Sequence, residues 1–176
     1  TSGLVFGKVR TFALRDEPMT VSLWIQLAPS RGRASKEIRV LGNGGVQKTD
    51  PGWLISLHRD VLQVRLCNGS NRAQIGGRWP VLRDGNWHQV VMVVDPGEST
   101  LSAFVDGEQV GNLNYKALGS HFPATHRLRI GTNGNAGDLA GLGGNVDELA
   151  IWRRALSDEE VRLLFERAEP LKATFR

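Results

Sequence analysis

The chain has 176 residues, of which 40% are hydrophobic and 23% are charged. This length fits one domain with a sizeable core, and the composition excludes a disordered or collagen-like chain. The net charge of +4 arises from 22 basic and 18 acidic residues that are interspersed along the chain, whereas nucleic-acid binding needs clustered Lys and Arg, so we expect no nucleic-acid partner.

Residues 19–27 alternate between apolar and polar side chains, with Leu23 and Ile25 on one side and Ser22 and Trp24 on the other. This period of two predicts a half-buried strand. Similar short runs predict further strands at residues 38–41, 53–57, 61–67, 89–94, 101–105, 109–113, 126–130 and 146–152.

Turn signals separate these runs. Asp106-Gly107 lies between two strand-like runs and predicts a type I′ hairpin, in which both central residues have positive φ. Asp84-Gly85 marks another turn. Eight or more strands without alternating helices indicate an antiparallel sandwich or barrel, which is an all-β fold.

One helix is predicted near the end of the chain. Residues 157–160 read Ser-Asp-Glu-Glu, a capping box in which Ser157 and Glu160 satisfy each other's backbone amides. The apolar face that follows consists of Val161, Leu164, Phe165 and Ala168. We expect this helix to close the sandwich without chemistry of its own.

Four segments together carry a family resemblance: residues 19–25, 86–91, 101–107, and 144–149 continued through 155–157. Their order and spacing resemble the laminin G-like jelly rolls of the concanavalin A-like lectin/glucanase superfamily. The resemblance implies an antiparallel two-sheet jelly-roll sandwich with one short C-terminal helix. We expect a single such domain over residues 1–176, excised from a larger protein.

Members of this group bind polysaccharides, bind proteins, or occasionally cleave glycans. Cleavage needs paired carboxylates across a cleft, which the glucanase relatives carry as Glu-x-Asp-x-Glu on one strand. That pattern does not occur here. Asp147 and Glu148 are adjacent, so in a regular strand they point to opposite faces, and residues 158–160 belong to the helix cap. We therefore predict that the chain is not an enzyme.

The resemblance also implies a structural calcium ion, because relatives hold Ca²⁺ with the Asp of the Val-Asp-Glu strand and backbone carbonyls. Here that residue is Asp147, and the alternative is a solvated or salt-bridged carboxylate. A second oxygen-rich group consists of Asn133, Asn135 and Asp138. His88 matches a framework Trp-His pair, so we expect it to be structural, and the other histidines lack zinc-site spacing.

Sugar binding usually requires an exposed aromatic ring surrounded by amides and carboxylates. Three tryptophans match framework positions and are expected to be buried: Trp24, Trp87 and Trp152. Trp53 is left open. The carbohydrate contacts that we predict lie in loops: Trp79, Tyr115, Asn133, Asn135 and Asp138. For the aromatic ones, the alternative is ordinary packing against the sandwich.

We therefore expect a non-catalytic binding module for a polysaccharide or another glycan, in an extracellular or periplasmic protein. The alternatives are a protein-interaction or spacer module and, third, a glycan-cleaving enzyme. The only cysteine, Cys67, excludes an internal disulfide but does not decide the compartment. No apolar run approaches the roughly 18 residues of a membrane span, so no membrane insertion is expected.

Overall fold

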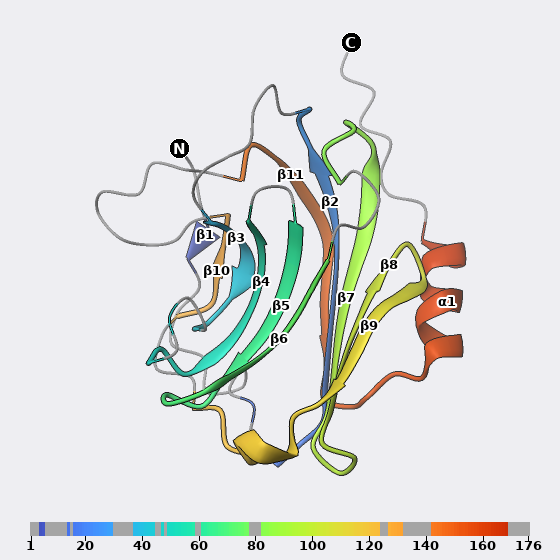
Figure 1. The fold of residues 1–176 in the computed structure, drawn as a ribbon. Helices are drawn as coiled ribbons and strands as arrows, with labels where there is room; N and C mark the ends of the chain where they lie inside the picture. The colour runs from blue at the N-terminus through green and yellow to red at the C-terminus, as the bar shows by residue number, and fades with distance from the viewer. Residues whose placement is uncertain are drawn as a thin grey trace.

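The computed structural model describes residues 4–5, 14, 16–29, 37–44, 47, 49–58, 61–77, 82–123, 127–131 and 142–168. Within these parts of the chain, two antiparallel sheets pack face to face, and one short helix lies against the outside of one sheet (Figure 1). The predicted all-β, two-sheet sandwich with a C-terminal helix is therefore confirmed.

The first sheet has six strands in the order β1-β10-β3-β4-β5-β6. Their bounds are β1 Leu4–Val5, β10 Arg129–Ile130, β3 Glu37–Gly42, β4 Gly52–His58, β5 Val61–Cys67 and β6 Arg72–Gly77. The second sheet has five strands in the order β11-β2-β7-β8-β9. Their bounds are β11 Gly144–Trp152, β2 Met19–Leu27, β7 Trp87–Asp95, β8 Thr100–Val105 and β9 Glu108–Asn114.

The core lies between the two sheets. On β2, the residues on one side of the alternation, Val21, Leu23 and Ile25, are completely buried in it. Trp53 on β4 reaches the same core from the opposite sheet and is also completely buried. The two-residue period of the sequence thus determines which side chains meet between the layers.

Two strands were not predicted, and one is shorter than predicted. β6 turns only Ala73 and Ile75 toward the core, and β1 has two residues, so neither has a long apolar pattern. The predicted strand at 126–130 is reduced to Arg129–Ile130, with residue 126 outside the described residues.

The Asp106-Gly107 hairpin has the predicted conformation. Its two central residues have φ values of 51° and 79°, as a type I′ turn requires, and it joins β8 to β9. Asp106 therefore lies at one end of the five-stranded sheet, beside the start of β7, where its backbone amide donates to the carbonyl of Gln89.

Helix α1 (Asp158–Arg167) covers part of the outer face of the five-stranded sheet (Figure 1). Its predicted capping box is present: the Ser157 hydroxyl accepts from the Glu160 amide, and the Glu160 carboxylate accepts from the Ser157 amide. Val161 is completely buried against Val91 and Phe104 of the sheet. This second cluster fixes the helix to the sandwich.

The lone cysteine lies at the end of β5. Cys67 is completely buried, and burial is the largest cause that raises the pKa of its thiol to about 11. No helix in the described part of the chain has the length and apolar character to span a bilayer.

Candidate binding groove

The candidate site lies on the outer face of the five-stranded sheet, between helix α1 and the edge strand β11. Ser22 and Trp24 point away from the core, yet they are only 3% and 5% exposed. Trp24 is covered in part by Phe165 of α1, whose ring stacks on the indole. The helix and β11 thus turn this part of the sheet into the base of two connected hollows.

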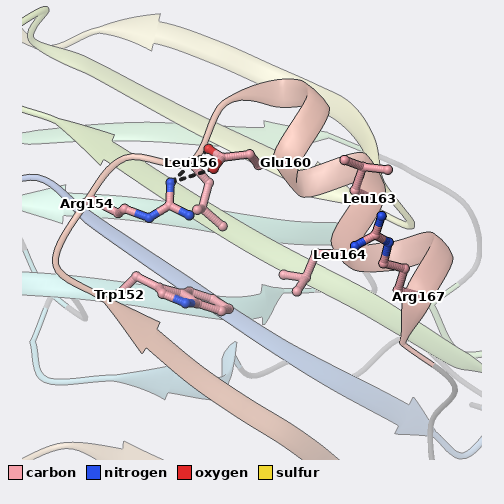
Figure 2. Close-up of a pocket in the computed structure, with 7 residues that line it drawn as sticks. All are labelled: Trp152, Arg154, Leu156, Glu160, Leu163, Leu164 and Arg167. Atoms are coloured by element: carbon pink, nitrogen blue, oxygen red, sulfur yellow. Dashed lines mark hydrogen bonds and ion pairs between the residues drawn. The ribbon is translucent and has the colours of Figure 1, made fainter.

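The first hollow, here called the helix groove, has a volume of about 260 Å³. It is lined by Trp152, Arg154, Leu156, Glu160, Leu163, Leu164 and Arg167. Figure 2 shows the residues from the end of β11 and the segment after it on one side, and those of α1 on the other. Trp152 is half-buried, so part of its indole remains accessible in the groove.

Two of the residues that line the helix groove, Arg154 and Glu160, form an ion pair. Arg154 Nη1 donates to both carboxylate oxygens of Glu160, at 2.8 and 2.9 Å (Figure 2). The Ser157 amide is the largest cause that lowers the pKa of Glu160, and Arg154 adds to it. Glu160 is therefore ionised at neutral pH, and the groove presents an aromatic surface beside fixed charges.

The second hollow, the inner pocket, has a volume of about 250 Å³ and shares Trp152 and Leu164 with the helix groove. The sheet supplies Ser22, Trp24 and Gln89. The other lining residues come from β11 and the end of α1: Glu148, Leu149, Ala150, Trp152, Leu164 and Ala168. Trp24 and Gln89 are direct cross-strand neighbours, since they pair in the register of β2 and β7.

Two polar atoms of the inner pocket have no hydrogen-bond partner in the described part of the chain: Nε1 of Trp24 and Oε1 of Gln89. Both side chains are at least nine-tenths buried, at 5% and 1% exposure. Leaving a buried donor or acceptor unsatisfied costs about 1–3 kcal/mol, so such atoms normally meet a water or a ligand. The pocket thus has unmet capacity both to donate and to accept.

A β-bulge in β11 shapes one wall of this pocket. The register with β2 shifts between Asp147 and Ala150, and Glu148 has a φ of 48°. Val146 and Leu149 both pack on the core, so two residues rather than one separate them. The regular alternation expected for Asp147 and Glu148 is therefore wrong, because the bulge interrupts it and places Glu148 in the pocket wall.

Asp147, the predicted calcium ligand, lies in this bulge opposite Trp24. Its Oδ1 accepts the amide of Glu148 at 2.8 Å. Among the described residues, no three or more His, Cys, Asp or Glu side chains cluster as a metal site would. Asp147 thus belongs to no such cluster in the described part of the chain, and a calcium ion beside it would need oxygen ligands of other kinds as well.

His88 is clamped between two carboxylates. Its Nδ1 lies 2.7 Å from Oδ2 of Asp106, and its Nε2 lies 3.1 Å from Oδ1 of Asp84. The hydrogen bond with Asp106 is the main cause that raises the pKa of His88 above its ordinary value. Because both ring nitrogens are engaged, this geometry ties the start of β7 to the β8–β9 hairpin, as a structural role requires.

The remaining predicted site residues fall into two groups. Trp79, Asn133, Asn135 and Asp138 lie outside the described residues. Tyr115 is only 2% exposed, and its ring packs edge-on against Phe122. This ring belongs to the core, which argues against direct contact with a sugar.

The framework tryptophans differ in exposure. Trp24 is buried as predicted, and Trp53, which the sequence left open, is a core residue. Trp87 and Trp152 are only half-buried, so the expectation of burial is wrong for these two. Trp152 remains accessible because it follows the bulge at the edge of the sheet, where α1 leaves a groove beside it.

Sequence reasoning missed Gln89, Glu148 and the helix residues Leu164 and Ala168 as parts of a site. One signal was present: Trp24 is a large aromatic residue on the outward side of an alternating strand. A large aromatic side chain on the outer face of a sheet indicates that another element packs over it there. A pocket can form where such an element leaves space above the sheet.

The stacked antiparallel sheets define a jelly-roll sandwich, and comparison with known proteins places it in a family. Residues 4–162 match the family model of the Concanavalin A-like lectin/glucanases superfamily, so the chain belongs to that superfamily. The resemblance inferred from the sequence is confirmed. A comparison with curated protein sequences gives no match.

Solved structures share the fold at low sequence identity. The binding domain of Paraclostridial Mosquitocidal Protein 1 is similar with a TM-score of 0.75 and 18% identity, over 93% of this chain and 40% of that one. The CBM40 of the Ruminococcus gnavus IT-sialidase has a TM-score of 0.68 and 19% identity, over 86% and 84% of the two chains. The botulinum neurotoxin serotype D ligand binding domain in complex with N-acetylneuraminic acid has a TM-score of 0.71 and 12% identity, over 93% and 39%. The chain thus spans about two fifths of the toxin domains that it resembles.

Proposed function

We propose that the chain is a non-catalytic carbohydrate-binding module of a larger extracellular or periplasmic protein, with a polysaccharide or another glycan as its ligand. The observation that carries this proposal is the helix groove, in which the half-buried indole of Trp152 lies beside the Arg154–Glu160 pair. Binding sites for small ligands combine apolar and aromatic walls with a few fixed polar groups, and hydrogen bonds to charged groups are the stronger ones.

Membership of the superfamily and the likeness to a sialidase CBM40 and to a toxin domain with a bound sugar support this proposal. The chemistry of the groove supports a non-catalytic role. The carboxylates that line the two described hollows are Glu148 and Glu160. A glycosidase needs an acid with a raised pKa, whereas Glu160 is held ionised by Arg154 and the Ser157 amide.

Two earlier predictions remain part of this proposal. Trp79, Asn133, Asn135 and Asp138 are proposed as additional ligand contacts from the loops, and Asp147 as a carboxylate ligand of a structural calcium ion. Tyr115 is omitted, because its ring is buried.

The test is retention on a panel of immobilised neutral and acidic polysaccharides, in buffer with calcium. We expect the wild-type chain to be retained on at least one of them, and Trp152→Leu to weaken retention. Trp87→Leu is the matched control, because Trp87 is also a half-buried tryptophan of the five-stranded sheet but does not line either hollow. Unchanged melting temperatures would show that both variants are folded. Absence of retention on every polysaccharide would contradict the proposal.

A further inference from the structure

The inner pocket holds a buried donor and a buried acceptor on adjacent strands. We infer that it binds the hydroxyl edge of one neutral sugar ring, using Trp24 Nε1 and Gln89 Oε1. This inference rests on the proposed carbohydrate function and assigns the class of sugar. It stands on two residues that line the same hollow, each with a buried polar atom that has no hydrogen-bond partner in the described chain.

A hydroxyl group suits this pair of atoms. One oxygen can accept from the indole N–H of Trp24 and donate its own proton to the amide oxygen of Gln89. A pair of neighbouring hydroxyls can do the same, one to each atom. Both atoms are almost fully shielded from solvent, so a hydroxyl bonds to them only where the neighbouring side chains shift to admit it.

The walls of the inner pocket suit the carbon skeleton of a sugar ring. Trp152, Leu164 and Ala168 give apolar surface around the polar base. The volume of about 250 Å³ is below the roughly 300–1,000 Å³ of sites for drug-sized ligands, so it suits a single ring rather than an oligomer. Because Trp152 and Leu164 also line the helix groove, a chain that ends in the inner pocket continues along that groove.

The charge of the pocket selects against acidic sugars. Glu148 is the charged residue in its lining, and the described lining contains no Lys or Arg. A sugar carboxylate would therefore meet a like charge without a compensating cation, while a neutral hydroxyl can donate to Glu148. Glu148 also holds a positive φ of 48°, a strained conformation of the kind that occurs at binding sites.

The experiment titrates the folded chain with glucose, galactose, mannose and xylose while the indole N–H resonances are followed by NMR. We expect at least one of these sugars to shift the Trp24 resonance, and glucuronic acid and N-acetylneuraminic acid to shift it far less. Trp24→Phe keeps a ring against Phe165 but removes the donor, and Gln89→Leu removes the acceptor at similar size. Each variant should weaken binding of that sugar by roughly tenfold or more, since it leaves the partner hydroxyl unsatisfied. Because Trp24→Phe lacks the Trp24 indole N–H, its sugar binding is followed through the resonances of other residues.

Two further variants make the result specific. Trp87→Phe is the matched control, because Trp87 is half-buried but does not line the inner pocket, and it should leave sugar binding unchanged. Glu148→Gln should raise the affinity for glucuronic acid relative to glucose. The melting temperature of each variant shows whether it is folded.

The outcomes separate this inference from the proposed function. If polysaccharides are retained but no neutral sugar shifts the Trp24 resonance, the inference is wrong, while the function stands. If a neutral sugar shifts the Trp24 resonance but no polysaccharide is retained, the pocket assignment stands and the polysaccharide function is wrong. If neither is observed, both are wrong.

Discussion

The indole of Trp24 on β2 and the ring of Phe165 on α1 are stacked, with centroids 5.7 Å apart and planes inclined by 20°. This contact joins the helix to the sheet at the inner pocket. Phe165→Ala should lower the free energy of unfolding by about 1–3 kcal/mol, less than for a fully buried ring because Phe165 is half-buried. Urea unfolding measures this difference. Arg162→Ala, on the exposed side of α1, should have a much smaller effect, and equal effects would contradict the importance of the stack.

The cap of α1 gives a second prediction. Ser157→Ala removes the hydroxyl that accepts from the Glu160 amide, and should destabilise the chain by about 1 kcal/mol. Ser157→Asn retains an acceptor at this position and should recover most of the loss. Thermal and urea unfolding of the three proteins measure the difference. A Ser157→Asn variant as unstable as Ser157→Ala would show that the cap does not act through this hydrogen bond.

His88 should make stability depend on pH near neutrality. Its pKa is raised above 6.5, chiefly by Asp106 and further by Asp84, while burial opposes the shift. Because the folded state binds the proton more tightly, this stabilisation is complete below the unfolded pKa and is lost as the pH rises through the folded pKa. An NMR titration of the imidazole should give a pKa above 6.5.

The same residue allows a direct control. The unfolding free energy of His88→Gln should lack the decline that the wild type shows above its unfolded pKa. Asp84 contributes to the unfolding free energy in a different pH range. The hydrogen bond from the Asn86 amide is the largest cause that lowers the pKa of Asp84, to about 2. That contribution is lost only in acid. A wild-type profile parallel to that of His88→Gln would contradict the proposed clamp.

Gly111 on β9 gives a prediction about the contact between the two sheets. A methyl group at this position would overlap Cγ2 of Ile75 on β6. Gly111→Ala should therefore destabilise the chain by about 1–3 kcal/mol, as other overpacked sites do. Gly76→Ala is the control, because its nearest neighbour is the flexible end of Gln74 at 3.4 Å. Equal unfolding midpoints for the two variants would disprove this close approach.

Calcium binding at Asp147 is tested by melting the chain with calcium and with a chelator. A bound ion stabilises the folded state by RT ln(1 + [L]/Kd), so we expect a higher melting temperature with calcium and a smaller increase in Asp147→Asn. Magnesium serves as a control, because it prefers fewer ligands in a more rigid geometry. An unchanged melting temperature would contradict a calcium site.

Much of the fold could be predicted from the sequence, because local chemistry determines it. The alternation at β2, the Asp106-Gly107 turn and the Ser157 cap each specify a local conformation that the structure retains. β6 escaped prediction because its place depends on pairing with β5 rather than on its own apolar pattern. Short strands of this kind are defined by their neighbours.

The candidate site could be predicted much less well. Gln89 looked like an ordinary polar residue of a strand, and its significance depends on Trp24 being its cross-strand partner. Glu148 enters the pocket wall only because a bulge shifts the register, and the sequence contains no signal for a bulge of this kind. Sites that form between a sheet and a distant helix depend on long-range geometry.

The buried sulfur of Cys67 has a consequence for where such a domain can be used. With a pKa of about 11, the thiol carries almost no thiolate at neutral pH, and the thiolate is the form that attacks disulfides and oxidants. The folded sandwich therefore keeps its thiol unreactive toward both oxidants and disulfides, and its fold does not depend on the redox state of the surroundings.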